Sequence, residues 1–321
     1  MKILITGGAG FLGHRLALKL LEKNTLRFDD EHGETINELV LLDHVDGPRI
    51  NDPRIRQVKG DISQPGVIDD VIDKDTKVIF HLAAVVSGQA ETEFDLGMSI
   101  NLDASRHLLE VCRRLGHCPR IIFTSSIAVY GGELPELVVD TTPLNPLSSY
   151  GVAKAMAEML LGEYARRQFV DGRVLRLPTV SIRPGRPNLA ASSFASSIIR
   201  EPLNGEEAVC PVPATTRLWL MSPRCAIDSL IHGSEVNSVA LGDNRAINLS
   251  GMSITVADML ASLRQIAGDK AYQLVRFEPD IMIQNIVGGW PGAWDINRAQ
   301  ALGFPINESF DKVIRDHIDN S

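Results

Sequence analysis

Met1-Lys2-Ile3-Leu4-Ile5-Thr6-Gly7-Gly8-Ala9-Gly10-Phe11-Leu12-Gly13 is the stretch that decides the fold of this chain. The apolar run at 3–5 predicts a strand buried on both faces, and the residues after 13 favour a helix. Gly7, Gly10 and Gly13 stand between them at the spacing G-x-x-G-x-x-G. Glycines at these places permit a sharp turn, let a pyrophosphate approach the main chain and bring the helix close to the strand. Because the free N–H groups at the start of the helix attract negative charge, the stretch predicts a dinucleotide-binding site.

Composition narrows the class of protein. The 321 residues are enough for about two domains, and no apolar run approaches the roughly 20 residues of a membrane-spanning helix. We expect no signal peptide, because strand and glycine-turn residues begin at once. The net charge of −8 argues against nucleic acid and anionic membranes as partners. The cysteines form neither a C-x-x-C pair nor a repeated metal-ligand spacing, which predicts reduced thiols, a cytoplasmic protein and no metal; they are Cys112, Cys118, Cys210 and Cys225.

Strands and helices alternate along the first half of the chain. Helical sequence at 14–24 is followed by a polar stretch, 25–38, that we expect to be a surface insertion. Helical periodicity returns at 101–115. Buried strands are predicted at 38–43, 55–62, 78–84, 120–126 and 174–178. This order predicts an α/β protein with a Rossmann-type, doubly wound parallel sheet.

Residues at the predicted strand ends bear on the choice of cofactor. Asp43 ends the second strand, where a carboxylate can hydrogen-bond the adenosine ribose and repel a 2′-phosphate, so NAD is favoured over NADP. The insertion places Asp43 farther from the glycines than the usual ~20 residues, and the prediction rests on its position on the strand. His81 is interpreted as a buried strand histidine. The further residues expected along the cofactor are Asp61, Ile62, Leu82, Ala83 and Ala84.

Proline becomes frequent after residue 178, and the alternation of strands and helices ends. We therefore place an NAD-binding domain at 1–178 and a smaller α/β substrate-binding domain at 179–321. The boundary is approximate and allows the two parts to interleave. The second part is predicted to combine short strands with two or three helices, at 192–200, 255–266 and 307–318.

Tyr150-Gly151-Val152-Ala153-Lys154 is the second informative stretch. Tyr150 and Lys154 are four residues apart, so on a helix they share one face. Together with a dinucleotide turn and the Ser125-Ser126 strand end, they form an acid–base system in which Tyr150 takes the proton of a substrate hydroxyl. For Tyr150 to act near neutrality its pKa must fall, which requires roughly 4 kcal/mol of stabilisation of the phenolate. We expect the nearby Lys154 ammonium to supply this energy.

With these motifs the chain resembles the extended short-chain dehydrogenases/reductases, the NAD-dependent epimerase/dehydratase family. The matching motifs are T-G-G-A-G-F-L-G at 6–13, Asp43, G-D-I at 60–62, H-L-A-A at 81–84, Asn101, S-S-I-A-V-Y-G at 125–131 and Y-x-x-x-K at 150–154. The resemblance implies Ser126 as the catalytic serine, because it stands four residues before Tyr130, with Ser125 as second choice. The cofactor contacts that it implies beyond those above come from Phe11, Leu12, Asn101, Tyr150, Lys154, Leu177 and Pro178.

The same resemblance implies a homodimer. In relatives the helices that begin near Asn101 and Tyr150 form the dimer face, and here Met156, Met159 and Leu160 are suited to pack across it. The alternative is that these side chains only cover the sheet.

The C-terminal half departs from the sugar-nucleotide members of the family. Where many of them carry R-D-[FY]-[IV]-[HY]-V-x-D, this chain has R-L-W-L-M-S-P-R at 217–224, which keeps the arginine and loses both acids. With the loops at 182–188 and 191–194, this half is similar to the D-erythronate dehydrogenases. That similarity implies that Arg217 binds a substrate carboxylate, with Ser126 and Thr179 near the reacting hydroxyl. The rival arginines are Arg183, Arg186 and Arg224.

These features favour an NAD-dependent dehydrogenase that oxidises the C2 hydroxyl of a short sugar acid. The alternative is a sugar-nucleotide epimerase or dehydratase that keeps its NAD tightly bound. A third class, a non-catalytic NAD sensor, has no need of Ser126, Tyr150 and Lys154.

Overall fold

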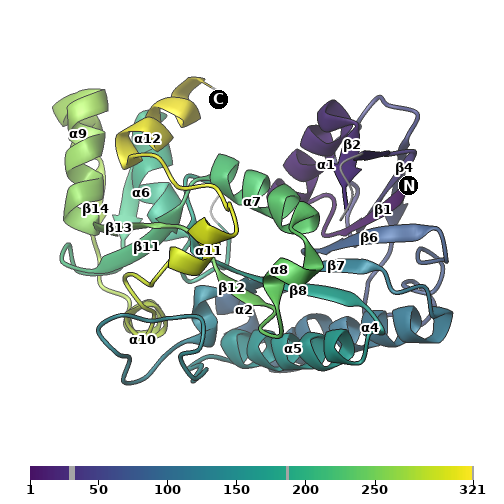
Figure 1. Cartoon of the computed structure of the whole chain (residues 1–321). Coiled ribbons are helices and arrows are strands. Elements are labelled where there is room, and N and C mark those ends of the chain that lie inside the picture. The colour runs from purple at the N-terminus through teal and green to yellow at the C-terminus, as the bar shows by residue number, and fades with distance from the viewer. Residues whose placement is uncertain (29–32, 186–187, 320–321) are drawn as a thin grey trace.

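A seven-stranded sheet forms the centre of the computed structural model, which describes residues 1–28, 33–185 and 188–319. All pairings between its strands are parallel. The order across the sheet is β12-β8-β7-β6-β1-β4-β5 (Figure 1). This arrangement confirms the predicted α/β, Rossmann-type doubly wound sheet. The strands are β1 (Lys2–Thr6), β4 (Glu38–Asp43), β5 (Ile55–Lys59), β6 (Thr76–His81), β7 (Arg120–Ser126), β8 (Asp171–Leu177) and β12 (Ala246–Asn248).

The chain changes direction across the sheet between β1 and β6. From β1 it moves through β4 to the edge strand β5, and then returns to pair β6 with the other side of β1. In an open α/β sheet the carboxyl ends of the strands form the ligand crevice at such a point. Gly7 directly follows β1 and Leu82 directly follows β6, so the glycine turn and the H-L-A-A motif meet at this crevice.

Helices cover both faces of the sheet (Figure 1). α1 (Phe11–Lys23) and α7 (Pro223–Glu235) lie side by side on one face, and α4 (Ala104–Leu115) and α5 (Ser149–Arg166) lie on the other. α1 therefore begins three residues before the predicted start at 14. Short elements connect these layers: α2 (Ser87–Thr92), α3 (Phe94–Met98), the π-helix η1 (Ser99–Asp103) and the 3-10 turn η2 (Ile127–Val129).

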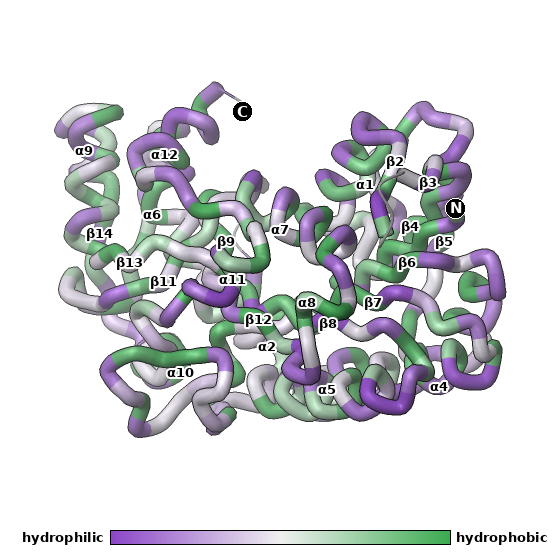
Figure 2. The backbone as a smooth tube through the Cα atoms, in the orientation of Figure 1, coloured by the Kyte–Doolittle hydropathy of each residue, from purple (hydrophilic) through white to green (hydrophobic). Residues whose placement is uncertain are grey.

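The strand side chains alternate between two apolar cores, one on each side of the sheet. Ile3 and Ile5 pack toward α1, while Leu4 packs toward α4. Figure 2 shows the central strands in the hydrophobic colour and the outer turns of the helices in the hydrophilic one. Strands buried on both faces are what a parallel sheet requires, and this explains the unbroken apolar run at the start of the chain.

The stretch at 25–38 is not a purely superficial insertion, contrary to the prediction. Residues 29–32 lie outside the described part of the chain, and on either side of them β2 (Thr25–Arg27) and β3 (Gly33–Thr35) form an antiparallel pair. Leu26 and Ile36 are fully buried in the core beneath α1. Because most residues of the stretch are polar, its sequence did not indicate that Leu26 and Ile36 are buried.

The C-terminal half forms a second core of its own. Its strands are β9 (Thr179–Val180), β11 (Arg217–Met221) and β13 (Met252–Thr255) in one sheet, and β10 (Ala208–Cys210) with β14 (Val275–Phe277) in another. Between 188 and 319 there are seven helices, more than the two or three predicted. Those not yet named are α6 (Phe194–Leu203), α8 (Ser238–Leu241), α9 (Val256–Tyr272), α10 (Ile281–Gly288), α11 (Asn297–Ala301) and α12 (Phe310–Asp319).

One of the differences from the sequence prediction has a visible cause. The predicted helix at 307–318 begins at Phe310, because the Asn307 side chain bonds to the backbone of Ser222 and Ser250 instead. After residue 178 the chain also returns to the central sheet, where β12 pairs with β8. No helix within the described ranges is long and apolar enough to cross a membrane.

Candidate active site

The glycine turn packs against the end of β6. Gly7 has a φ of +73°, and a Cβ there would lie 2.9 Å from the Ala83 nitrogen. A Cβ on Gly13 would overlap the Gly7 carbonyl oxygen. Gly10 is different: the only described atom close to its Cβ position is the Gly7 oxygen, at 3.2 Å. Gly7 and Gly13 therefore make the turn possible, while Gly10 leaves open space in front of the start of α1.

Two cavities meet at this turn, and together they fit a dinucleotide. One has a volume of about 310 Å³ and the other about 410 Å³. The residues that line both are Gly7, Gly10, Leu82 and Ala84. A pyrophosphate at the junction would meet the open backbone of Gly10 and the N-terminus of α1, with a nucleoside in each cavity.

The larger cavity holds the residues predicted for the adenosine half. Asp43, Asp61, Ile62 and Ala83 all line it. One Asp43 oxygen accepts a hydrogen bond from the Ala9 backbone (Oδ2–N 3.0 Å), so this carboxylate also braces the glycine turn. Its other oxygen lies 2.9 Å from His44 Nδ1. Asp61 is held by the backbone and hydroxyl of Ser63.

Asn101 stands behind the cavity wall rather than on it. Its side chain is buried and binds both backbone groups of Val85, with Oδ1 accepting from the nitrogen at 2.8 Å and Nδ2 donating to the oxygen at 3.0 Å. Val85 lines the larger cavity and Asn101 does not. Asn101 therefore clamps the loop after β6 and lines neither cavity, so it would act on the predicted cofactor contact through Val85.

His81 is part of the same support, as its interpretation as a buried strand histidine predicted. Its ring lies between two hydroxyls, 2.7 Å from Thr6 Oγ1 and 2.9 Å from Ser105 Oγ. Burial, and then the Lys154 charge, lower the pKa of His81 to about 3. The imidazole is therefore neutral at working pH and holds the strand ends by hydrogen bonds.

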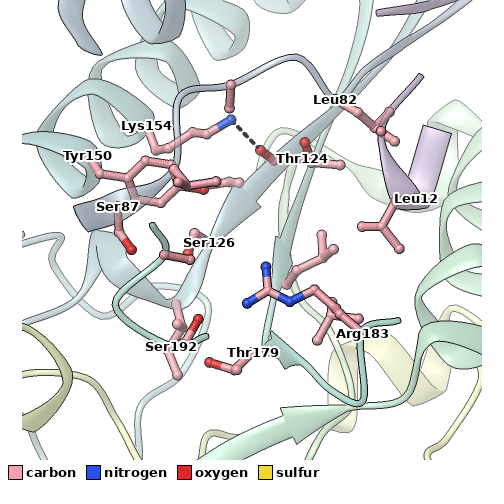
Figure 3. A pocket seen from close by; sticks show the side chains of 18 of the residues that line it. Leu12, Leu82, Ser87, Thr124, Ser126, Tyr150, Lys154, Thr179, Arg183 and Ser192 are labelled. Atoms are coloured by element: carbon pink, nitrogen blue, oxygen red, sulfur yellow. Dashed lines mark hydrogen bonds between the residues drawn. The ribbon is translucent and has the colours of Figure 1, made fainter. Parts of the chain in front are cut away.

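The smaller cavity holds the predicted catalytic residues (Figure 3). Tyr150 and Lys154 come from the first turns of α5, and Ser126 ends β7. The Ser148 hydroxyl caps α5 by accepting from the Gly151 nitrogen (3.2 Å). A Cβ on Gly151 would overlap the Ala128 carbonyl oxygen, so this glycine lets α5 approach the turn after β7. Local sequence thus brings Tyr150 and Ser126 to one wall.

The two adjacent serines have different surroundings. Ser126 points into the cavity beside Tyr150 (Figure 3), and its oxygen accepts a hydrogen bond from the Ala128 nitrogen. Ser125 is buried, and its hydroxyl has no hydrogen-bond partner among the described residues. Ser126 is therefore the better placed of the two to meet a substrate oxygen.

Lys154 is fixed beneath Tyr150. Its Nζ donates to the Thr124 carbonyl oxygen at 2.9 Å and lies 4.6 Å from the centre of the Phe123 ring and 5.8 Å from the centre of the Tyr150 ring. The side chain is almost wholly buried. Burial lowers the pKa of Lys154 to about 8, against the opposing effect of the Glu158 carboxylate.

The expected lowering of the Tyr150 pKa is not produced by the protein groups alone. Burial raises the pKa of the phenol, and the Ser126 hydroxyl and the Arg183 guanidinium act against that rise. The neighbouring cation that acts on Tyr150 is thus Arg183, whereas the spacing on α5 predicted Lys154. The positive charge of an oxidised nicotinamide would act in the same direction as Arg183.

Arg183 is the arginine that the structure brings to the cavity. It follows β9, and its guanidinium points toward Ser126 and Thr179 (Figure 3). Arg200 approaches it from behind, with Nη1 donating to the Arg183 carbonyl oxygen at 2.5 Å. Within residues 1–28, 33–185 and 188–319, no carboxylate pairs with Arg183. A half-buried guanidinium without a carboxylate partner in the described ranges, beside the Ser126 and Thr179 hydroxyls, is suited to bind an anion.

Arg217 does not reach the cavity, contrary to the prediction. It begins β11, is exposed and donates to the Ser253 hydroxyl (Nη1–Oγ 3.3 Å), while Gly292 packs on its aliphatic stem. Arg224 lines a separate groove and lies near Asp228 and Glu308. Arg186 lies outside the described residues.

Several cavity residues were not predicted from the sequence. The cavity lining also includes Ser87, Asn188, Ser192 and Trp290, together with the predicted Phe11, Leu12, Leu177, Pro178 and Thr179. Ser87 accepts a hydrogen bond from the Ala191 nitrogen (3.0 Å), which joins the start of α2 to the loop before α6. The position of Ser87 just beyond the H-L-A-A motif was a usable signal, whereas the loop residues carry no periodicity.

Comparisons with known proteins agree with this geometry. The sequence model of the NAD dependent epimerase/dehydratase family matches residues 3–218. Over the full chain, the sequence is 57% identical to the D-erythronate dehydrogenase of Cupriavidus necator, covering 99% of that protein. It is 47% identical to the D-erythronate dehydrogenase of Haemophilus influenzae, with 99% of each chain covered. A crystal structure described as the nucleoside-diphosphate-sugar epimerase from Agrobacterium tumefaciens matches with a TM-score of 0.91 and 42% identity, covering 100% of this chain and 94% of that one.

Proposed function

Because the chain belongs to the NAD-dependent epimerase/dehydratase family, we propose that it oxidises the C2 hydroxyl of a short sugar acid of the D-erythronate type to the 2-oxo acid. The chain is an NAD-dependent oxidoreductase acting on CH–OH groups. The more specific assignment follows the two D-erythronate dehydrogenases that match it from end to end. One observation supports a sugar acid in particular: Arg183, without a carboxylate partner in the described ranges, shares a cavity with Ser126 and Tyr150.

The proposed chemistry divides the work among four side chains. NAD supplies the acceptor for the hydride that leaves C2. Tyr150 takes the proton of the C2 hydroxyl as that C–H bond breaks, and Ser126 hydrogen-bonds the same oxygen. Lys154 contributes its charge from the cofactor side. Arg183 binds the carboxylate in bidentate fashion and so fixes which carbon faces the cofactor.

The experiment is a screen of hydroxy acids with NAD. We expect D-erythronate to yield NADH, measured by absorbance, with its C2 epimer D-threonate as the matched comparison. Net NADH formation is what separates a dehydrogenase from an epimerase, which recycles its cofactor.

A sugar-nucleotide epimerase remains the second candidate, because the 42% identical crystal structure carries that description. Interconversion of nucleotide sugars without net NADH, and no turnover of any acid, would favour it. The loss of both acids from the run at 217–224 argues for the sugar acid.

We also propose that the enzyme is a cytoplasmic homodimer. All four cysteines are free, as reduced thiols in the cytoplasm would be. Val152, Met156 and Met159 are exposed on α5 at helical spacing, which gives that helix an apolar outer face. Leu160 is half-buried and packs inward against the core, so it takes no part in that face.

A further inference from the structure

Glu158 lies one turn beyond Lys154 on α5, and the catalytic role given to Tyr150 does not account for it. Residues 150, 154 and 158 follow one another at a spacing of four and share one face of the helix. Lys154 and Glu158 are both buried, with 1% and 5% of their surfaces exposed. A buried carboxylate is costly unless hydrogen bonds and an opposite charge compensate it.

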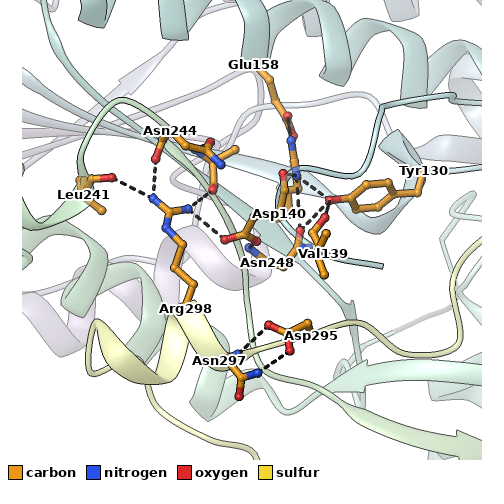
Figure 4. Close-up of polar contacts among 12 residues, drawn as sticks. Tyr130, Val139, Asp140, Glu158, Leu241, Asn244, Asn248, Asp295, Asn297 and Arg298 are labelled. Carbon is orange, nitrogen blue, oxygen red and sulfur yellow. Dashed lines mark hydrogen bonds and ion pairs between the residues drawn. The ribbon is translucent and has the colours of Figure 1, made fainter. Parts of the chain in front are cut away.

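Arg176 of β8 supplies that compensation. Its Nη2 donates to Glu158 Oε2 at 2.7 Å, and its Nε lies 3.1 Å from Oε1. The other side of the guanidinium faces the Tyr130 hydroxyl (Nη1–O 2.5 Å). Tyr130 in turn donates to Asn248 of β12 at 3.0 Å (Figure 4). Glu158 is therefore held by Arg176, and the guanidinium is in turn fixed by Tyr130 and, through it, by Asn248.

Apart from the Phe123 ring, whose centre lies 4.6 Å from Nζ, the buried ammonium of Lys154 has few groups that compensate its charge. Its one hydrogen bond to a described residue is to the Thr124 carbonyl. The titratable groups that face it are Tyr150 and Glu158 from α5 and His81 from β6, with Arg176 of β8 behind Glu158. His81 is neutral, and Tyr150 carries no charge until it has given up its proton. Glu158 is thus the anion on which the charged state of Lys154 depends.

We propose that Glu158 is a positioning residue for Lys154: clamped by Arg176 beneath α5, it supplies the carboxylate that keeps the buried ammonium charged beside the nicotinamide site. This inference rests on the proposed function for the role of Lys154. It does not depend on which acid the enzyme oxidises.

The sign of the effect can be stated in advance. Burial lowers the pKa of Lys154 to about 8 and Glu158 limits the fall, so removing that carboxylate lowers the pKa further. The ammonium would then be lost at a lower pH. Binding of the cofactor, which the ammonium assists, would weaken at a lower pH in the variant than in the wild type.

The test is NADH binding, followed by fluorescence between about pH 6 and pH 10, in the wild type and in Glu158→Gln. We expect wild-type affinity to fall as the pH rises past about 8. In the variant the midpoint should move down by about one pH unit, equivalent to about fivefold weaker binding at the wild-type midpoint and about tenfold well above it. An unchanged midpoint overturns the proposal. Because no acid is present, a failure of the proposed function would instead appear as absent turnover in the substrate screen.

The matched control is Tyr130→Phe, which removes a contact to Arg176 without changing any charge near Lys154. Its midpoint should equal that of the wild type, and a shift as large as that of Glu158→Gln would mean that packing, not charge, controls Lys154. If Glu158→Gln alone does not fold, the double variant Glu158→Gln/Arg176→Gln removes the unpaired guanidinium. A downward shift smaller than that of Glu158→Gln is expected there, because the Arg176 charge that repels the Lys154 ammonium is lost as well. The absence of any downward shift in the double variant counts against the proposal.

Discussion

Lys154 donates a hydrogen bond from Nζ to the backbone carbonyl oxygen of Thr124 at 2.9 Å. Thr124 lies two residues before Ser126 on β7, so one strand fixes the charge below Tyr150 and also presents the hydroxyl beside it. The ammonium cannot follow the phenol into the cavity without giving up this bond. Lys154 is therefore placed to act through its electric field, while Tyr150 and Ser126 are placed to make contact.

Tyr150→Phe should abolish turnover while leaving cofactor binding intact. The substitution keeps the aromatic ring beside Lys154 and removes only the hydroxyl that we propose takes the proton. We expect kcat to fall by about 100-fold or more, the usual effect of losing a general base, with NADH affinity unchanged. Steady-state kinetics measures the change in kcat, and fluorescence titration measures the NADH affinity. Turnover near the wild-type value would remove Tyr150 from the mechanism.

Asp43→Asn should narrow the preference for NAD over NADP. The asparagine oxygen can still accept from the Ala9 nitrogen, so the glycine turn keeps its brace while the negative charge is lost. We expect the ratio of kcat/KM for the two cofactors to fall by about tenfold, equivalent to ~1.4 kcal/mol of repulsion.

The control for Asp43 is Asp46→Asn. Asp46 is exposed, pairs with Lys59 and does not line either cavity. In Asp46→Asn the ratio of kcat/KM with NAD to kcat/KM with NADP should equal that of the wild type. Equal efficiency with NADP in the wild type itself would contradict the role given to Asp43.

Arg183→Gln should raise the KM for the sugar acid. Loss of a charge-assisted hydrogen bond is worth about 1.5–3 kcal/mol, which is roughly 10- to 150-fold in affinity. NADH affinity should not change, because the guanidinium lies on the substrate side of the cavity. Arg217→Gln is the matched variant, since Arg217 contacts Ser253 outside the cavity. A larger rise of the KM in Arg217→Gln than in Arg183→Gln would favour Arg217 as the residue that binds the carboxylate, as the sequence predicted.

The sequence predicted those parts of the site that are local in the chain. Gly7, Gly10 and Gly13 are fixed by the geometry of one turn, and Tyr150 and Lys154 by the pitch of one helix. Their spacing in the sequence is therefore enough to predict how they lie relative to one another. The same holds for Asp43, whose predicted role depends on its place at the end of one strand.

The parts that were missed depend on contacts between distant segments. Ser87 meets Ala191, which lies 104 positions farther along the chain, and no periodicity marks either residue. β12 has three residues, too few to show a strand pattern. Arg217 was assigned from a motif whose acidic partners are absent, and in the folded chain its stem is covered by Gly292. Which arginine faces the cavity was decided by tertiary packing.

Met159→Lys should dissociate the proposed dimer. Met156 and Met159 are 43% and 67% exposed on α5, and a lysine on that apolar face would bring a charge into the interface. Light scattering at micromolar concentration should give about twice the chain mass of 35.1 kDa for the wild type and the single mass for the variant. If the wild type is a monomer, the exposed methionines of α5 do not form a dimer interface.

Gly88→Ala should weaken binding of the sugar acid without touching a catalytic residue. A Cβ on Gly88 would overlap the Leu189 carbonyl oxygen, in the loop that Ser87 holds through Ala191. The loop must move outward, and it carries Ser192, which lines the cavity. We expect KM for the acid to rise severalfold while NADH affinity stays the same. The matched control is Gly162→Ala on α5, where no described atom outside the adjacent turns of its own helix lies within 4 Å of the new Cβ. That substitution should leave KM unchanged and raise the free energy of unfolding by about 0.5–1 kcal/mol, since alanine favours the helix. An unchanged KM in Gly88→Ala would mean that the loop does not shape the substrate site.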